Sequence, residues 1–219
     1  MTPIDLVIHA LPVLLMGAVV TLKFALASSV LGLLVGIFVA IMGISGQPLI
    51  ADIARGYVSL MRGTPLLVQI FVVYYGLPDL GISLDPTSAG ILALTANAAA
   101  YLSESMRGAI LGIGQGQWGA AHSLGLNHLQ TLRYVICPQA LRIAVPSLGN
   151  TLISLIKDTS LVSVITVTEM LRAAQEVIAS TFQPLPLYLS AAAIYWLLST
   201  AMSRVQRHVE RRLALAHVR

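Results

Sequence analysis

Residues 24–51 read FALASSVLGLLVGIFVAIMGISGQPLIA and contain no charged side chain. A helix needs about 20 predominantly apolar residues to cross the hydrocarbon core of a bilayer, so this stretch is long enough to do so. Ser28, Ser29, Gly32 and Gly36 recur at spacings that let a second helix approach closely. The stretch therefore predicts a membrane-spanning helix with another helix packed against it.

The composition of the whole chain supports the same class. Of its 219 residues, 57% are hydrophobic and 10% are charged, whereas about 25% of the residues of a soluble domain are charged. This excludes a soluble enzyme, a disordered chain and a disulfide scaffold. The single cysteine, Cys137, allows no internal disulfide, the spacing of the five histidines predicts no metal site, and no Walker A loop is present. We expect an all-α polytopic membrane protein.

Proline, glycine and charge positions divide the chain into five predicted spans. Met1 to Asp5 carries no positive charge, so no cleaved signal peptide is expected. Residues 3–11 are interpreted as an interfacial segment, with a separate extra span as the alternative. Thr64-Pro65 predicts a kink or restart inside the second span. The five spans are about 12–43, 50–78, 88–111, 140–165 and 187–203, and residues 166–185 are expected to form a loop.

Basic side chains are distributed unequally between the connecting segments. Most of the 13 Lys and Arg residues fall in segments 44–62, 105–142 and 204–219: Arg55, Arg62, Arg107, Arg133, Arg142, Arg204, Arg207, Arg211, Arg212 and Arg219. The remaining loops carry Arg172 with Asp5, Asp79, Asp85, Glu169 and Glu176. Because basic loops stay inside, the N-terminus is predicted outside and the C-terminus inside. The basic charge then faces anionic lipid headgroups, and no nucleic acid is needed to explain it.

Two outer side chains have open interpretations. Glu169 and Arg172 are expected to be solvated on the outer surface, with contact to an outer partner as the alternative.

Segment 112–138 has the pattern of a structured loop. Residues 117–124 can form a short helix that Gly125 closes in the C′ position. Asn127 and Gln130, three residues apart, form a capping-box-like pair at the start of a second short helix. Neither helix is long enough to cross a membrane.

This loop resembles the EAA loop of ABC-transporter permeases, whose pattern is E-A-A, three residues, G, nine residues and I-x-L-P. Here Gly119-Ala120-Ala121 is followed by Gly125 and by Val135-Ile136-Cys137-Pro138, which fits the spacing in full. Gly119 stands where the family has glutamate. It weakens the helix by about 0.5–1 kcal/mol relative to Ala and removes a carboxylate that the helix dipole favours.

Further motifs extend the resemblance over nearly the whole chain, to the polar amino-acid uptake permeases. In chain order they are Arg62-Gly63-Thr64-Pro65-Leu66, Asn97-Ala98-Ala99-Ala100-Tyr101 with Glu104 and Arg107, Gln117-Trp118, Pro138-Gln139-Ala140-Leu141-Arg142, Pro146, Asn150 and Lys157-Asp158-Thr159-Ser160-Leu161. Tyr74-Tyr75-Gly76-Leu77-Pro78 and Leu84-Asp85-Pro86 look most like the cystine-type members.

The resemblance implies the type I (MetI-like) importer permease fold in a bacterial cytoplasmic (inner) membrane. Residues 1–219 would form a single permease domain, with a coupling loop at about 112–138 and a cytosolic tail at 204–219. The implied partners are an ATPase dimer, a second permease subunit, an amino-acid-binding protein outside and membrane lipid. The chain would not be an enzyme and would hold no cofactor, because ATP and Mg²⁺ bind to the ATPase. The implied ATPase-coupling residues are Trp118, Gly119, Ala120, Ala121, Leu124 and Gly125; an ordinary surface helix is the alternative.

Polar residues within the predicted spans are candidates for a substrate pathway, because ionisable side chains inside a membrane usually face a cavity. The ammonium of an amino acid could pair with Glu104 or Asp158, and we expect Asp158 rather than Lys157 to point inward. The carboxylate could bind Arg107, Asn97, Thr159 or Ser160. Tyr101 is a pathway residue or a packing residue. As an alternative, Glu104–Arg107 and Lys157–Asp158 are structural ion pairs.

The predicted function is therefore transport of polar amino acids, possibly cystine, by alternating access driven by a separate ATPase. A structural or assembly subunit of another membrane complex is the main alternative. An ion-coupled carrier is a further one, but it predicts internal repeats, and none are evident in the sequence.

Overall fold

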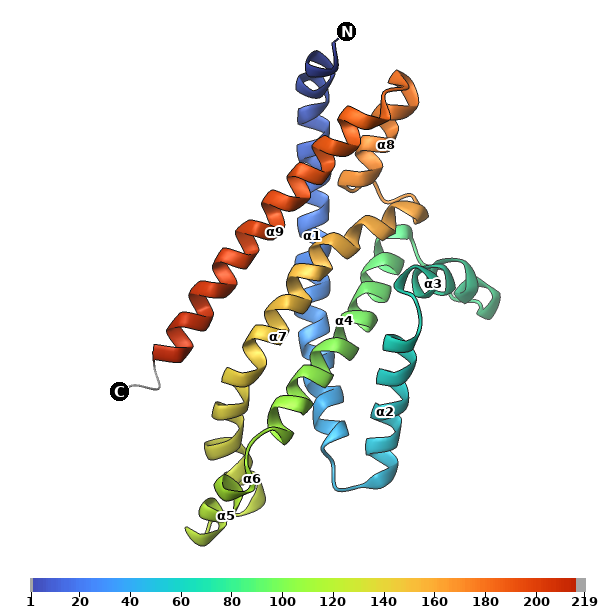
Figure 1. Cartoon of the computed structure of the whole chain (residues 1–219). Coiled ribbons are helices and arrows are strands. Elements are labelled where there is room, and N and C mark those ends of the chain that lie inside the picture. Colours follow the sequence, from blue (N-terminus) through green and yellow to red (C-terminus); the bar gives the residue numbers. More distant parts are fainter. Residues whose placement is uncertain (1, 216–219) are drawn as a thin grey trace.

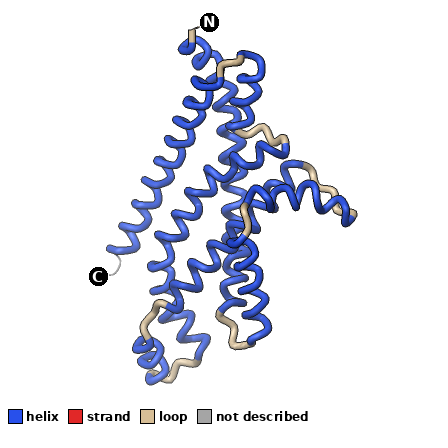
Figure 2. Tube along the Cα trace, turned by 45° about the vertical axis from the view of Figure 1, so that its right-hand side comes forward, coloured by secondary structure: helices blue, strands red, loops and turns tan. Residues whose placement is uncertain are grey.

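The computed structural model describes residues 2–215, with side chains to residue 213, and all regular structure in that range is helical (Figure 2). Arg219, part of the predicted inner tail, lies outside the described residues. The helices are α1 (Pro3–Gly43), α2 (Pro48–Gly63), α3 (Leu66–Phe71), α4 (Pro86–Leu111), α5 (Gln115–Ser123), α6 (His128–Thr131), α7 (Cys137–Asp158), α8 (Met170–Thr181) and α9 (Pro184–Leu215).

The helices are arranged along the long helix α1. Figure 1 shows α4 and α7 running beside α1, with α8 and the N-terminus at one end of the molecule and the α5–α6 hairpin at the other. Helix α9 begins near α8 and leaves the bundle at an angle, and α3 projects to the side. The helix bundle therefore has two ends. In the predicted orientation, the end with the N-terminus and α8 is the outer end, and the end with the α5–α6 hairpin is the inner end.

Helix α1 differs from the sequence-based expectation at its start. It is continuous from Pro3, so the separate extra span is wrong, and residues 3–11 are part of the same helix as the predicted first span. The interfacial location of residues 3–11 stays a prediction. Pro12 lies inside the helix and does not end it. Leu6, Ala10 and Leu14 are buried in one cluster with residues of α8 and α9, and this packing offsets the about 3 kcal/mol that an interior proline costs.

The predicted close approach of a second helix to the small-residue face of α1 is confirmed, and this second helix is α4. A Cβ atom added at Gly32 would lie 3.2 Å from the Ala98 Cβ, and one at Gly36 would lie 3.1 Å from the Ala99 carbonyl oxygen. The two backbones are therefore in near contact along this seam, which only small residues allow.

The second predicted span is broken as expected, but the break is sharper than a kink. Helix α2 ends at Gly63, α3 begins at Leu66, and the two axes differ by 105°. Pro65, rather than Thr64, occupies the position before α3. After α3, a π-helical turn (Val72–Gly76) and a 3₁₀ turn (Leu77–Leu80) carry the chain outward to Asp85.

Asp85 fixes the start of α4. Its carboxylate accepts hydrogen bonds from the backbone N–H groups of Thr87 and Ser88, at 2.9 and 3.1 Å. Hydrogen bonding from Ser88 is the largest of the effects that hold the pKa of Asp85 below its ordinary value. The helix thus begins within two residues of the predicted residue 88 and ends at the predicted Leu111.

Three helical stretches among the described residues are long and apolar enough to cross a membrane, namely Pro3–Gly43, His128–Ile165 and Pro184–Leu213. The bent pair α2–α3 is a fourth if it counts as one span. Helix α4 is long enough, but polar residues from its middle onward, including Asn97, Glu104 and Arg107, lower its apolarity. Because α1 and α7 cover it, α4 needs less apolar surface than a lipid-facing helix. Five crossings and the orientation stay predictions.

The segment predicted as a loop at 166–185 contains the helix α8, so that prediction is wrong. Helix α7 continues into a 3₁₀ segment, η4 (Thr159–Ile165), which ends at Thr166 in the left-handed region, and α8 then begins at Met170. Helix α9 also extends beyond the predicted span 187–203 into the basic tail as far as Leu215.

Candidate substrate cavity and coupling hairpin

The break between α2 and α3 is held by a side-chain network. The Gln69 amide Nε2 donates to the carbonyl oxygens of Met61 (2.8 Å) and Thr64 (3.2 Å) and to the Thr64 hydroxyl (2.9 Å). Asn97 of α4 donates to the Met61 carbonyl (3.2 Å) and to Gln69 Oε1 (3.0 Å). Carbonyl groups freed at a helix break need such partners when water is excluded, so this network stabilises the 105° turn.

A cavity of about 550 Å³ lies beside this break, between the α2–α3 connection, α4 and α7. Its lining combines hydroxyl, amide and carboxylate groups with apolar walls, which suits a small polar ligand. The lining residues are Thr64, Pro65, Leu66, Asn97, Ala98, Tyr101, Ser147, Asn150, Thr151, Ser154, Leu155, Asp158 and Leu161.

Three of the predicted pathway residues meet at this cavity. Asn97 and Tyr101 line it from α4, and Asp158 lines it from the end of α7. Asp158 is partly buried, whereas the neighbouring Lys157 is exposed. The cavity therefore contains a carboxylate, an amide and an aromatic ring within reach of one ligand.

Glu104 and Arg107 lie in a different pocket. The Arg107 guanidinium donates to Glu104 through Nε (2.9 Å) and a terminal nitrogen (2.5 Å). The pair lines a smaller pocket, of about 270 Å³, together with Arg55 and Arg62 of α2 and residues of α1. Both side chains are about one third exposed, so the pair is accessible but lies outside the larger cavity.

Thr159 and Ser160 do not line the cavity either. Thr159 is fully buried, and its hydroxyl donates to the Ile156 carbonyl at 2.8 Å within its own helical turn. Ser160 is half-buried on the 3₁₀ segment η4. The structure thus separates these two residues from Asn97, Tyr101 and Asp158.

The second predicted site is the hairpin of α5 and α6. Gly125 has φ +79°, which glycine adopts without strain at a helix C′ position. The predicted capping box is confirmed, since Asn127 Oδ1 accepts from the Gln130 N–H and Gln130 Oε1 accepts from the Asn127 N–H, both at 2.9 Å. These local signals determine the turn between the two helices.

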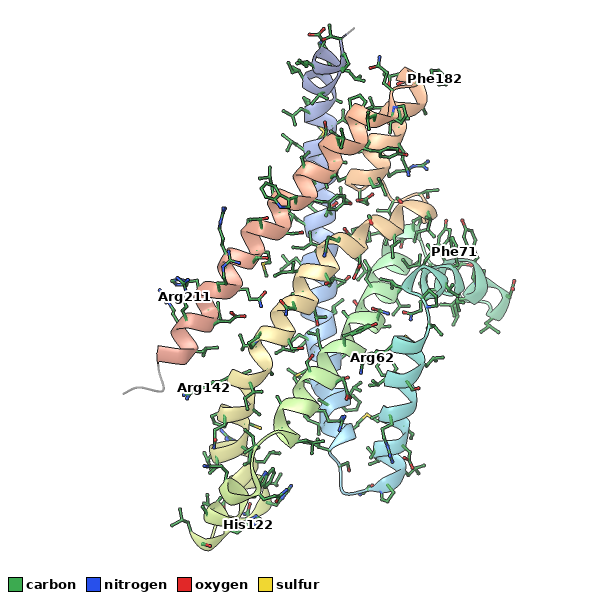
Figure 3. All side chains as sticks on the ribbon, in the orientation of Figure 1. Arg62, Phe71, His122, Arg142, Phe182 and Arg211 are labelled. Atoms are coloured by element: carbon green, nitrogen blue, oxygen red, sulfur yellow. The ribbon has the colours of Figure 1, made fainter. Side chains whose placement is uncertain are left out.

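One side of the hairpin is anchored on the bundle. Ala121 is buried, and Trp118 packs against a cluster that includes Ile113 and Ile136. The Trp118 ring also stacks on His128 of α6, with the centroids 5.5 Å apart. The hairpin is therefore held in a defined position at the end of α7 (Figures 1 and 3).

The other side of the hairpin is exposed. Leu124 is 81% exposed, Gly119 and Ala120 are also exposed, and a Cβ at Gly119 would meet nothing within 4 Å. Leu129 is also exposed, at 76%, whereas Ile136 is fully buried. This exposed side is where the predicted coupling residues Gly119, Ala120 and Leu124 lie.

The sequence does not predict the roles of two polar residues, Gln69 and Glu169. Gln69 was not singled out, although its position shortly after Thr64-Pro65 is a signal for a side chain that caps a helix break. Glu169 was expected on the solvated surface, and that is wrong because it is fully buried. It accepts from the Tyr195 hydroxyl (2.5 Å), the Thr21 hydroxyl (3.2 Å) and the Arg172 N–H (2.9 Å).

Apolar helices of spanning length around a polar cavity, with an exposed hairpin at one end, define a membrane permease subunit. Residues 32–215 match the family described as "Binding-protein-dependent transport system inner membrane component". The chain belongs to this family, which confirms the predicted resemblance.

Curated relatives are similar over nearly their whole length. The chain is 42% identical to the L-cystine transport system permease protein TcyB of Bacillus subtilis, covering 96% of this chain and 91% of the relative. It is 38% identical to the glutamine transport system permease protein GlnP of Escherichia coli, covering 94% and 95%.

Solved structures agree with this family assignment. A chain of an amino acid ABC transporter superposes with a TM-score of 0.91 at 35% identity, covering 97% of this chain and 99% of that one. A chain of the MetNI methionine ABC transporter superposes with a TM-score of 0.75 at 19% identity, covering 93% and 97%, which supports the predicted MetI-like fold.

Family membership confirms several predictions. The chain is a component of a bacterial inner membrane and a transport subunit rather than an enzyme. Members of the family are inner membrane components of binding-protein-dependent transport systems, and the ATPase of an ABC importer is a separate chain. An assembly subunit of an unrelated complex and an ion-coupled carrier are therefore not supported.

Proposed function

We propose that the chain forms part of the pathway of an ATP-driven importer for polar amino acids, with cystine as the first candidate substrate. The names of its relatives support this class of substrate, and the relative at 42% identity is a cystine permease. The observation that carries the proposal is the cavity of about 550 Å³, which offers charged and neutral polar groups to one small ligand.

Within this cavity, Asp158 would hold the ammonium group of the amino acid by a charge-assisted hydrogen bond. Ser154, one turn before Asp158 on α7, would bind the carboxylate through its hydroxyl. The Thr151 hydroxyl, two turns before Asp158, already donates to the Ser147 carbonyl at 3.1 Å. Asn97 already donates to Met61 and Gln69, so its role is to shape the cavity. Glu104 and Arg107 would line the route beyond the cavity, in the smaller pocket.

A second permease subunit would complete the pathway. Ser147, Asn150 and Ser154 form an exposed polar face on α7, and polar groups facing lipid are costly. A second copy or a similar chain would cover this face, so that two single-domain subunits, each with residues 1–219, enclose the substrate between them. The exposed basic residues at the end of α9 would contact anionic lipid: Arg204, Arg207, Arg211 and Arg212.

The α5–α6 hairpin would transmit the work of the ATPase. Gly119, Ala120 and Leu124 would contact a groove of the ATPase, while Trp118 and Ala121 fix the hairpin on the bundle and Gly125 sets its turn. ATP and Mg²⁺ would bind to that partner, and we assign no cofactor to this chain.

The test is uptake into proteoliposomes that contain the permease, its ATPase and its binding protein. We expect ATP-dependent uptake of cystine or of another polar amino acid, and Asp158→Asn should lower it at least tenfold because a charge-assisted hydrogen bond is worth about 1.5–3 kcal/mol. Lys157→Gln is the matched control and should leave uptake within twofold. If no amino acid enters, or if both variants behave alike, the proposal fails.

A further inference from the structure

The larger cavity and the smaller charged pocket are consecutive along α2 and α4. On α4, Asn97 and Tyr101 line the cavity, and Glu104 and Arg107 line the pocket one to two turns further on. On α2, Arg55 and Arg62 line the pocket, and the cavity begins at Thr64. The predicted orientation places the pocket on the inner side of the cavity.

The boundary between the two spaces is formed by two side chains. The Arg62 guanidinium carbon lies 5.3 Å from the centre of the Tyr101 ring and above its face. Arg62 belongs to the pocket and Tyr101 to the cavity. This cation–π contact joins α2 to α4, and it lies between a residue that lines the pocket and a residue that lines the cavity.

The surroundings of Arg62 also offer it a second position. Arg107 is already engaged by two hydrogen bonds with Glu104, whereas Arg62 is exposed and rests on a neutral ring. Glu104 lies about one helical turn beyond Tyr101 on the same helix, and Glu104 and Arg62 line the same pocket. A long arginine side chain can therefore move from the ring towards this carboxylate.

We infer that Arg62 and Tyr101 form the inner gate of the transport pathway, which closes when the guanidinium covers the ring and opens when it moves towards Glu104. This inference rests on the proposed transport function and assigns a gating role to two residues of that pathway. It explains why an arginine immediately precedes the α2–α3 break, since the break network holds the end of α2 at a fixed distance from α4.

A cysteine-accessibility experiment on the assembled complex tests the gate. Cys137 is replaced by serine, and Ser154→Cys places one thiol in the cavity. The thiol is labelled with a membrane-impermeant maleimide from the inner face of inside-out vesicles without ATP. We expect Tyr101→Leu and Arg62→Met each to raise the labelling rate about fivefold, which corresponds to about 1 kcal/mol for the lost cation–π contact.

Three control variants separate the gate from general loosening. Tyr101→Phe keeps the ring face and should label at the parent rate. Arg55→Met removes an arginine of the same pocket that does not contact the ring and should also label at the parent rate. The double variant Arg62→Met/Tyr101→Leu should label no faster than either single variant, because both changes remove the same contact.

The outcomes separate the two proposals. The gate is refuted if Tyr101→Leu and Arg62→Met stay within twofold of the parent, if Arg55→Met matches them, or if access rises only from the outer face. Labelling does not require an amino acid. If uptake of every amino acid fails while the labelling pattern holds, the substrate class is wrong and the gate stands.

Discussion

The surroundings of Glu169 and Glu104 are the opposite of what their positions in the sequence suggest. Glu169 lies within a predicted outer loop, yet it is fully buried and bonded to neutral groups of α1, α8 and α9. Glu104 lies within a predicted span, yet it is about one third exposed and paired with Arg107 beside a pocket. Position relative to a predicted span thus says little about exposure, which depends on the neighbouring helices.

The comparison also separates structural from functional roles. Glu169 accepts hydrogen bonds from residues of three helices, α1, α8 and α9, so we expect it to stabilise the fold. Glu104 makes its ion pair within one helix, and such exposed pairs contribute about 0–1 kcal/mol. The predictions below test this contrast, from the largest expected effect to the smallest.

The largest effect is expected for Glu169→Leu. This change leaves the Tyr195 and Thr21 hydroxyls and the Arg172 N–H without their acceptor, and each unpaired buried group costs about 1–3 kcal/mol. We expect a loss of stability of about 3 kcal/mol or more, measured by thermal unfolding of the detergent-solubilised complex.

The control variant for this prediction also removes one of the hydrogen-bond donors to Glu169. Tyr195→Phe together with Glu169→Leu should recover part of the loss, since both ends of the shortest hydrogen bond are then apolar. A melting temperature of Glu169→Leu equal to that of the parent would show that the cluster is not structural.

Gly17→Ala tests the packing beside the same cluster. A Cβ at Gly17 would lie 2.7 Å from the Met170 Cα, which is backbone and cannot easily move. We expect destabilisation of about 1–3 kcal/mol from overpacking. Gly56→Ala, in a helix but with nothing within 4 Å, is the control and should be neutral or stabilising by about 0.5–1 kcal/mol. Equal melting temperatures for the two variants would contradict the contact.

Glu104→Gln should act on transport rather than on folding. Because the ion pair is partly exposed, we expect a change in stability below about 1 kcal/mol, with lower uptake and lower substrate-stimulated ATPase activity. Assembly is measured by size-exclusion chromatography of the purified complex. If the complex falls apart, Glu104 is a structural residue like Glu169.

The smallest effect is expected at the hairpin, where Gly119→Glu restores the residue of the EAA pattern. A Cβ atom at this position meets nothing within 4 Å, and loss of glycine stabilises α5 by about 0.5–1 kcal/mol. We expect association with the ATPase to be unchanged or stronger, measured as a dissociation constant. Gly116→Glu, also exposed in α5, is the matched control. Weaker binding for Gly119→Glu alone would show that this surface has diverged from the family.

Local signals made the hairpin and the α2–α3 break predictable from the sequence. The Asn127–Gln130 capping box, Gly125 and Thr64-Pro65 each act through residues a few positions away. The burial of Glu169 was not predictable, because its partners Thr21 and Tyr195 are distant in the sequence and come together only in the fold.

The candidate cavity was predictable only in part, for the same reason. Asn97, Tyr101 and Asp158 were proposed from motif positions, and the fold brings them together. Motif position alone did not separate them from Glu104 and Thr159, since the side of a helix that a residue faces depends on which helices pack around it. Gln69 was missed because its role depends on a break whose angle the sequence does not specify.

The seam between α1 and α4 limits how the molecule can change shape. At Gly32 and Gly36 the two backbones approach so closely that no room remains for sliding past the alanines of α4. We therefore expect these two helices to move as one rigid body during transport. The relative displacement would then fall on α7 with its 3₁₀ extension and on the bent pair α2–α3, whose connection lines the larger cavity.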